Sequence, residues 1–408
     1  MRRWLVGCAL VVSGWTSGAL AQPGSLSPQR VEVLPRTPGA HWVWVEDVIL
    51  HRTALVDPDR PRFLGMLSSG LGNIVPLFSA ERGEIYLPET YYARGTRGTR
   101  TDVVTIYDST TLAPLAEIGI PAERAEHASG VATAALSDDG RFVAVFNLTP
   151  ATSLSIVDVR ERRFVGRVET PGCSLVYAAG PRRFLMLCGD GAALTVSLDA
   201  HGQVVSKRRS APFFDPIGDP VTEKAARWGS RWLFVSFEGV IHGVDVSGDS
   251  LRFDAPWSLM EAAGGPAGWR IGGAQHLAVH GPSGRLFVLV HRGGPDTHKQ
   301  AGTEVWGYDL ATRRRQLRIA APNPTVLFLG RAMGMDSEGW RDGLLRWLLG
   351  ALLPNPGADR IVVTQDPEPL LLLESSFPAT LAVLDARSGE FLRDVPEIGI
   401  AGGQLRVP

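Results

Sequence analysis

The sequence lacks the features that mark several large classes of protein. Its 408 residues carry 41 basic and 42 acidic side chains, so the net charge of −1 offers no footprint for nucleic acid or an anionic membrane. No block of like charges indicates a disordered tail. The chain also lacks the motifs of a nucleophile elbow, a phosphate-binding loop, an H-E-x-x-H zinc helix and a paired C-x-x-C site. These absences argue against nucleic-acid partners and against an enzyme that acts alone.

Long apolar runs are scarce, and the one near the start is short. Arg2 and Arg3 precede an apolar stretch over residues 4–12, and Ala19-Leu20-Ala21 has the small-x-small pattern of a cleavage site. A membrane anchor would need about 20 apolar residues without interruption. We therefore expect residues 1–21 to be a secretory signal peptide, and the mature chain to be exported without a transmembrane segment.

Cysteine is rare as well, with three in the whole chain, and Cys8 lies in the expected signal peptide. An exported protein meets an oxidising compartment, so a disulfide is the natural state of Cys173 and Cys188. It would close a loop of about 15 residues across two extended stretches, worth about 3 kcal/mol. Two buried thiols are the alternative. Zinc is disfavoured because no second Cys or His pair stands at ligand spacing.

Helical periodicity is nearly absent, whereas short β-branched or aromatic runs recur between turn residues. One unit, a short apolar strand that ends in Asp before a polar turn, occurs seven times. Its aspartates are Asp57, Asp108, Asp158, Asp199, Asp245, Asp309 and Asp385. We expect each carboxylate to bond the backbone of its own turn.

Four of the six intervals between these aspartates are 41 to 51 residues, which is typical of propeller blades. The first unit begins with its second strand at Trp42 to Val45, so its innermost strand should come from residues 402–407. The sequence therefore predicts an all-β fold. It is a seven-bladed β-propeller over residues 40–408, closed by N- and C-terminal strands and preceded by a Pro-rich arm at 22–39.

The interval from Asp309 to Asp385 holds about 30 extra residues, which we place in an insertion at 323–358. Within it Gly343 to Leu353 is apolar nearly all round and is followed by prolines, which predicts a short helix. At about 11 residues this helix is too short to span a bilayer. It could pack on the propeller flank, touch a membrane surface, or bind a partner. Its candidate partner residues are Leu344, Trp347, Leu348 and Leu352.

Two further segments could carry contacts. Residues 94–102 predict a basic, Gly-spaced hairpin with Arg94, Arg97 and Arg100. The hairpin could be solvated, with Asp102 paired to Arg100 for little net stability, or it could contact a protein partner. In residues 269–273, two glycines follow Trp269 and Arg270, which indicates a close approach of the backbone.

Taken in order, several motifs resemble the heavy subunit of methylamine and aromatic amine dehydrogenases. They are Leu67-Ser-Ser-Gly70, Arg97 to Asp102, Thr149-Pro-Ala151, Pro171-Gly-Cys173 with Cys188-Gly-Asp-Gly191, Gly268 to Gln275 with His280, and His298-Lys299. The resemblance runs from about Trp42 to the C-terminus except for the insertion. It implies a periplasmic seven-bladed propeller with a disulfide at the two matching cysteines.

The resemblance also implies that the chemistry belongs to a partner. In this family a small light subunit carries the tryptophan tryptophylquinone cofactor and the catalytic Asp, and passes electrons to a blue copper protein or a cytochrome. The complex contains two heavy and two light chains. We therefore expect no catalytic, cofactor-binding or metal residue in this chain. A heavy-chain phenylalanine lines the substrate channel of the methylamine enzyme, and the resemblance places its position near Leu71.

The function expected from this resemblance is that of a non-catalytic heavy subunit. It would bind the light subunit and shape the substrate channel for oxidative deamination of a primary amine. The candidate channel and light-subunit contacts are Leu71, Arg94, Arg97, Arg100, Asp102, Trp269 and Arg270. The alternative is an orphan periplasmic propeller that serves as a protein-binding scaffold without a light chain.

Overall fold

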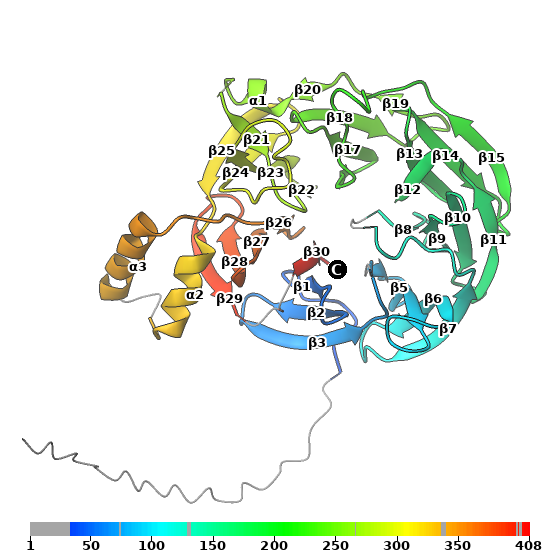
Figure 1. Ribbon diagram of the computed structural model, residues 1–408, viewed down its shortest axis with the longest axis horizontal. Coiled ribbons are helices and arrows are strands. Elements are labelled where there is room, and N and C mark those ends of the chain that lie inside the picture. Colours follow the sequence, from blue (N-terminus) through cyan, green and yellow to red (C-terminus); the bar gives the residue numbers. More distant parts are fainter. Residues whose placement is uncertain are drawn as a thin grey trace, which may run out of the picture. The chain divides into compact units, whose positions relative to one another are not determined.

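Antiparallel strands make up most of the chain in the computed structural model, which describes residues 33–408 except 73–74, 129–131, 266, 336–339, 397–398 and 400–401. The expected signal peptide at 1–21 and most of the arm at 22–39 lie outside the described residues. Leu34–Pro408 form one compact unit. Within it seven sheets of four or five strands stand in a ring, which confirms the predicted seven-bladed β-propeller (Figure 1).

Each of the first four blades has four strands, ordered from the axis outward. Blade 1 contains β30 (Gly402–Arg406), β1 (Val43–Asp47), β2 (Arg52–Asp57) and β3 (Arg62–Ser68). Blade 2 contains β4 (Leu77–Ser79), β5 (Glu84–Tyr92), β6 (Arg100–Asp108) and β7 (Pro114–Ile120). Blade 3 contains β8 (Ala134–Leu136), β9 (Phe142–Asn147), β10 (Ser153–Asp158) and β11 (Arg163–Glu169). Blade 4 contains β12 (Cys173–Ala178), β13 (Arg183–Cys188), β14 (Ala193–Leu198) and β15 (Val204–Arg209).

Blades 5 and 6 each have a fifth short strand, and the three helices of the described residues lie in the links between blades. Blade 5 contains β16 (Ala226–Trp228), β17 (Arg231–Val235), β18 (Val240–Asp245), β19 (Arg252–Phe253) and β20 (Trp257–Ser258), and α1 (Leu259–Ala262) follows it. Blade 6 contains β21 (Trp269–Ile271), β22 (Leu277–His280), β23 (Arg285–Arg292), β24 (Glu304–Asp309) and β25 (Arg314–Ala320). The helices α2 (Pro324–Ala332) and α3 (Trp340–Leu352) come next. Blade 7 contains β26 (Arg360–Val363), β27 (Leu370–Ser376), β28 (Ala379–Asp385) and β29 (Phe391–Val395).

The middle strands of a blade are buried because neighbouring blades cover both of their faces. In blade 3, β9 and β10 are buried at every residue, whereas β15 at the rim of blade 4 is largely exposed. One cluster of buried apolar side chains joins Phe142 and Ile156 of blade 3 to Phe184 and Val196 of blade 4. A single blade cannot bury such faces alone, so the ring depends on contacts between neighbouring blades.

Strands from the two ends of the described chain close the ring, as predicted (Figure 1). β30 pairs with β1, and places Leu405 opposite Val45 and Arg406 opposite Trp44. The side chain of Gln275 in blade 6 also holds this strand. Its Nε2 donates to the carbonyl of Leu405 at 2.9 Å, and its Oε1 accepts from the Leu405 N–H at 3.0 Å. The innermost strand of blade 1 is therefore anchored both by its own sheet and by a second blade.

The seven repeated aspartates cap the turns that follow the third strands, as predicted. In every copy the carboxylate accepts a hydrogen bond from a backbone N–H two or three residues further along the chain. Such a bond satisfies a backbone donor in a turn that has no ladder partner. The repeat therefore marks the turn between the third and fourth strands of each blade.

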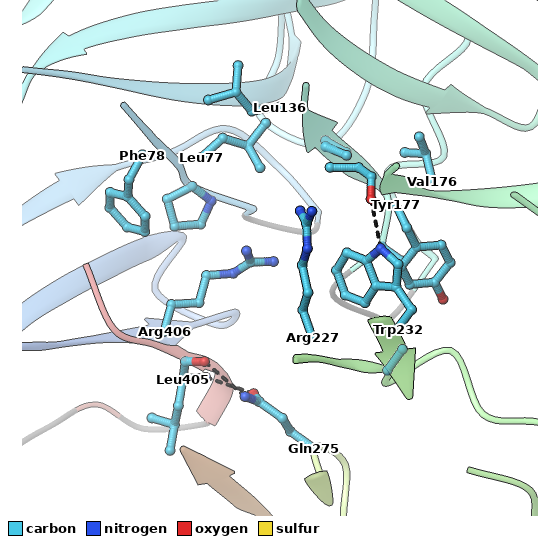
Figure 2. Close-up of a pocket in the computed structure, with 16 residues that line it drawn as sticks. Leu77, Phe78, Leu136, Val176, Tyr177, Arg227, Trp232, Gln275, Leu405 and Arg406 are labelled. Carbon is cyan, nitrogen blue, oxygen red and sulfur yellow. Dashed lines mark hydrogen bonds between the residues drawn. The ribbon is translucent and has the colours of Figure 1, made fainter. Parts of the chain in front are cut away.

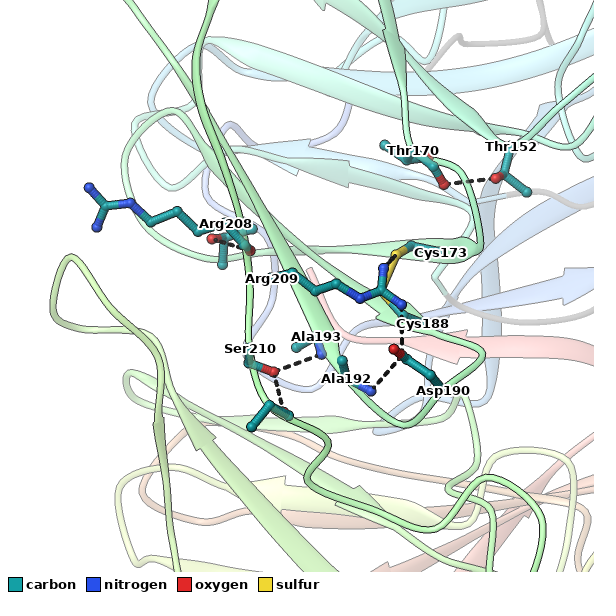
Figure 3. The surroundings of a disulfide bond; sticks show 12 residues. Thr152, Thr170, Cys173, Cys188, Asp190, Ala192, Ala193, Arg208, Arg209 and Ser210 are labelled. Atoms are coloured by element: carbon teal, nitrogen blue, oxygen red, sulfur yellow. Dashed lines mark hydrogen bonds and ion pairs between the residues drawn. A yellow bond between two sulfur atoms is a disulfide. The ribbon is translucent and has the colours of Figure 1, made fainter.

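Cys173 and Cys188 form a disulfide between β12 and β13, where they are direct partners across the two strands (Figure 3). This confirms the predicted bond and excludes the alternative of two free thiols. The guanidinium of Arg209 on β15 donates to the Cys173 Sγ at 3.1 Å and pairs with the carboxylate of Asp190 at 2.7 Å. The disulfide thus lies under a charged pair at the edge of blade 4.

The helical insertion lies between β25 and β26 and contains two helices, where one was predicted. The missed helix, α2, has a recognisable start, since Pro324 occupies its first turn and the Asn323 Oδ1 accepts from the N–H groups of Thr325 and Val326. Val326 and Leu327 are buried, and Leu327 joins the core between blades 6 and 7. α3 contacts α2. No helix among the described residues is long and apolar enough to cross a membrane.

Candidate functional site

The loops that carry the candidate contact residues all reach one face of the ring. Strands alternate in direction, so the hairpin between the second and third strands ends on the same face as the link to the next blade. We call this the upper face. Its hairpins are residues 48–51, 93–99, 148–152, 189–192, 236–239, 293–303 and 377–378. On this face Leu71, Arg94, Arg97, Arg100 and Asp102 lie in or next to blade 2. Trp269, Arg270 and the helical insertion lie on the other side of the ring, at blades 6 and 7 (Figure 1).

The predicted basic hairpin is present between the long strands β5 and β6. The N–H of Ala93 donates to the carbonyl of Thr99 at 3.0 Å, and the N–H of Arg94 donates to the carbonyl of Arg97 at 2.9 Å. Gly95 and Gly98 have φ values of 74° and 99°, which residues with a side chain rarely adopt. The 93–99 hairpin therefore presents the exposed side chains of Arg94 and Arg97 to the solvent.

Asp102, at the base of this hairpin, pairs with Arg100 as expected, but its carboxylate is buried and not solvated. Its carboxylate accepts from the Nε and Nη2 of Arg100, both at 2.8 Å, and from the Thr90 Oγ1 at 2.9 Å. It also accepts from the backbone N–H of Arg124 at 2.9 Å. The segment with Arg124, in the link that follows β7, covers the carboxylate. This contact could not be predicted from the sequence because Arg124 is 22 residues away from Asp102 along the chain. Asp102 therefore holds three segments of the chain together.

Arg124 extends these contacts to the segment that contains Leu71. Its Nε donates to the Thr90 Oγ1 at 3.0 Å, and its Nη2 donates to the carbonyl of Leu71 at 3.1 Å. Burial lowers the pKa of Arg124 to about 10, so the guanidinium keeps its charge at neutral pH. Arg124 thus fixes the backbone of Leu71, whose own side chain is half-buried.

Two buried carboxylates complete this network. Glu89 accepts from the N–H of Gly70 at 3.0 Å and from the Tyr91 hydroxyl at 2.9 Å, and burial raises the pKa of Glu89. Glu126 accepts from the Tyr92 hydroxyl at 2.7 Å and pairs with Arg100 at 3.1 Å. The 93–99 hairpin, the segment 69–72 and the segment 124–126 are therefore tied into one unit, which we call the blade 2 network. Glu89, Arg124 and Glu126 were not predicted from the sequence because no motif links them.

Trp269 and Arg270 lie in the same part of the fold but have different surroundings. Trp269 is buried, packs against Trp306 with ring centres 5.0 Å apart, and has the guanidinium of Arg292 5.1 Å from its ring. Arg270 pairs with Glu238 of the neighbouring blade at 3.4 Å. Trp269 is thus a core residue, whereas Arg270 joins β21 of blade 6 to the 236–239 hairpin of blade 5.

The glycines after Arg270 allow the close backbone approach that the sequence predicted. A Cβ atom at Gly272 would lie 2.5 Å from the carbonyl oxygen of Gln300. At Gly273 it would lie 2.5 Å from that of Asp359, and this residue also has a φ of 95°. Beside them a cavity of about 420 Å³ is lined by Trp269, Arg292, Arg318 and residues of the insertion. Gly272 therefore lets two segments of blade 6 approach each other, and Gly273 lets blade 6 approach the start of blade 7.

Two cavities lie along the axis of the ring. The inner one, of about 410 Å³, is lined by innermost strands, and Figure 2 shows Arg227 and Arg406 reaching into it between Phe78 and Trp232. The second cavity, also of about 410 Å³, opens on the upper face and is lined by Glu223, Lys224, His276, His298 and Arg360, among others. Among the described residues, no group of three or more His, Cys, Asp or Glu side chains is placed to hold a metal ion.

His276 at this mouth makes the stability of the ring depend on pH. Burial, aided by the nearby Lys224, lowers the pKa of His276 from 6.5 to about 4. The unfolded chain therefore takes up a proton below pH 6.5 that the folded chain takes up only at lower pH. We expect acidification across this window to destabilise the fold by up to about 3 kcal/mol. We expect His276→Gln, which retains a polar group for Thr222, to flatten the fall in urea-unfolding free energy between pH 7 and pH 4.5. An unchanged pH slope would contradict this role. The comparison with the parent chain removes the contribution of the other histidines.

Comparisons with known proteins agree with the sequence resemblance. The family model of the methylamine dehydrogenase heavy chain matches residues 39–322. The methylamine dehydrogenase heavy chain of Paracoccus versutus is 28% identical over 371 residues, which cover 89% of this chain and 78% of that protein. The heavy chain of Methylophilus methylotrophus is 23% identical over 419 residues, which cover 98% and 94%.

Solved structures support the fold alone. A dihydro-heme d1 dehydrogenase in complex with DHE matches with a TM-score of 0.51 at 18% identity, covering 91% of this chain and 76% of that chain. A functionally unknown protein from Desulfotomaculum acetoxidans matches with a TM-score of 0.54 at 11% identity, covering 90% and 98%. Since the family model spans well over half of the sequence, this chain belongs to the methylamine dehydrogenase heavy chain family.

Proposed function

We propose that this chain is the non-catalytic heavy subunit of a periplasmic amine dehydrogenase. On its upper face it would bind a light subunit that carries tryptophan tryptophylquinone, and the complex would oxidatively deaminate a primary amine. Membership of the methylamine dehydrogenase heavy chain family supports this proposal. The observation that carries it is the blade 2 network, which holds exposed basic residues and Leu71 in one rigid arrangement on that face.

The residues of this chain would act by binding and by excluding water. Arg94 and Arg97 offer exposed positive charge to an acidic surface of the light subunit, which favours association and orientation. The Leu71 segment would form an apolar wall of the substrate channel, with its backbone held by Arg124. The quinone of the light subunit supplies the redox chemistry.

The wider assembly follows from the same family. The complex would contain two heavy and two light chains and would pass electrons to a blue copper protein or a cytochrome. Residues 1–21, with the pattern of a signal peptide, support export to the periplasm. Family membership thus supports the assembly, and the sequence pattern supports the export.

Purification of the mature chain from the periplasm of its source organism tests the proposal, with a tag placed in the N-terminal arm. We expect a small, cysteine-rich chain to co-purify and the preparation to reduce a redox dye only when a primary amine is added. Charge reversal of both hairpin residues, Arg94→Glu with Arg97→Glu, should reduce retention of the small chain at least about tenfold. Arg160→Glu, an exposed arginine in a turn of the opposite face, is the matched control and should retain it.

Three outcomes would contradict the proposal. Dye reduction by the isolated chain would place catalysis on this chain. Recovery of the chain with an unrelated protein, and without any small chain, would favour the orphan scaffold. Equal loss of the small chain in the Arg160→Glu control would show that the upper face is not the docking surface.

A further inference from the structure

The helix α3 exposes a continuous apolar stripe. Leu344, Trp347, Leu348 and Leu352 are exposed by 51%, 68%, 42% and 80%. These positions follow the i, i+3, i+4, i+8 spacing of one helix face, the pattern by which a helix normally buries its apolar side. Isolated exposed apolar residues are ordinary, but a contiguous stripe with an exposed tryptophan marks an interaction surface.

The chemistry of the stripe indicates what covers it. Between 343 and 352 the exposed positions of α3 are only Gly, Ala, Leu and Trp. The charged residue of this span, Arg346, is half-buried and donates from Nη2 to the carbonyl of Met335, which follows α2. Gly343 and Gly350 have open space where a Cβ atom would lie, so another helix can approach closely. An uncharged apolar stripe with small residues spaced along it is complementary to itself.

We propose that α3 pairs with α3 of a second copy of this chain, in antiparallel orientation. In a contact with twofold symmetry, the same pair of residues meets twice. If one residue of the first copy contacts another residue of the second copy, the same two positions also meet with the copies exchanged. With the axis beside Leu348, Leu344 of each copy lies against Leu352 of the other, and the two Trp347 rings cover the sides of the contact. Each copy offers several hundred Å² of apolar surface, since an aromatic side chain alone accounts for about 150–250 Å². Two copies together approach the roughly 1,000 Å² of a specific interface.

Other occupants fit the observations less well. The family match ends at residue 322, one residue before the helix-capping Asn323, so the stripe belongs to a part of the chain outside the matched region. We expect a light subunit common to the family to bind the part of the chain that the family model matches. A membrane-surface helix usually carries Lys or Arg on its exposed flank, whereas the exposed positions of α3 between 343 and 352 are uncharged. Pairing through α3 therefore does not depend on the proposed light subunit.

The mass of the mature chain in solution, purified without any light subunit, tests this pairing. Light scattering after gel filtration, at loads from about 1 to 100 μM, should give twice the monomer mass at the higher loads. Leu348→Asp places two carboxylates together at the axis and should weaken the dimer at least about tenfold. Ile217→Asp, at a site with 93% exposure away from α3, is the matched control and should leave the mass unchanged.

Cysteine cross-linking keeps the test decisive even if Leu348→Asp disturbs folding. Because both native mature cysteines are already paired, Leu348→Cys should form a disulfide-linked dimer under mild oxidation. Leu344→Cys alone should not, since it faces Leu352 of the other copy, but Leu344→Cys with Leu352→Cys should. A monomer at every load would overturn the pairing. So would a monomer that floats with vesicles of phosphatidylethanolamine and phosphatidylglycerol.

Discussion

Deletion of residues 402–408 is expected to abolish the cooperative thermal unfolding of this chain. The deletion removes β30, so Val45 loses its partner Leu405, and β1 becomes an unpaired strand edge beside the axis. Leu405 is 1% exposed and belongs to the core between blades 7 and 1. Without it the ring cannot close, and we expect most of the protein to be insoluble. Calorimetry of the soluble fraction measures the loss.

Two smaller changes show whether the effect of the deletion comes from loss of ring closure or only from a shorter chain. Leu405→Asp buries a charge in the same place and should lower the free energy of unfolding by at least about 3 kcal/mol. Removal of Pro408 alone, which is exposed, should have no effect. A deletion mutant that unfolds at the parent temperature would show that the ring does not depend on the strand from its C-terminal end.

The second large effect is expected from Asp102→Ala, which should lower the free energy of unfolding by about 3–5 kcal/mol. The carboxylate is buried and accepts hydrogen bonds from Arg100, Thr90 and the backbone of Arg124. Its removal leaves the buried guanidinium of Arg124 with less compensation for its charge, and several donors without an acceptor. Urea unfolding of the parent chain and the variant gives the difference.

An exposed ion pair supplies the control for this prediction. Asp59, which is about half-exposed, pairs with Arg393 at 3.2 Å and contacts the Nδ1 of His41 at 2.7 Å. Because these contacts are open to solvent, Asp59→Ala should cost less than about 1 kcal/mol. If Asp102→Ala and Asp59→Ala lower the free energy of unfolding by similar amounts, burial does not determine how much the blade 2 network stabilises the fold.

Hydrogen exchange tests whether Asp102 also orders the proposed channel wall. The N–H of Leu71 donates to the carbonyl of Thr90 at 2.7 Å, and that of Gly70 donates to Glu89. We expect the amides of Gly70 and Leu71 to exchange at least about tenfold faster in Asp102→Ala, because loss of the network raises the local opening frequency. Unchanged exchange in a folded variant would separate the stability of blade 2 from the position of Leu71.

Much of the fold could be predicted because it follows from local pattern and chain connectivity. The repeated aspartates indicated the number of blades, since each marks a turn whose backbone donors need an acceptor close in sequence. The missing inner strand at Trp42 predicted closure by residues 402–407, because a blade without it leaves an open edge. The helix α2 was missed because its apolar face is short, although the cap at Asn323 and Pro324 was a usable signal.

The candidate site was predicted only in outline. The 93–99 hairpin was visible as spaced glycines between arginines, but its anchoring was not, since Asp102 and Arg124 lie in separate segments. For the same reason the sequence predicted the pairing of Asp102 with Arg100 but not the burial of Asp102. The value of an ion pair depends on its burial, and burial is set by the link from the next strand that covers it.

Local pattern along the chain was enough to establish the β class, the seven units, their capping turns, the closing strand and the cysteine pair. These features depend on alternation along a strand, on neighbours a few residues away, and on the two cysteines that remain after the predicted signal peptide. The burial of Asp102, the place of Trp269 in the core and the exposure of the α3 stripe became known only from the folded ring. Burial is a property of what packs against a residue, and in a closed ring that neighbour is often a segment far away along the chain.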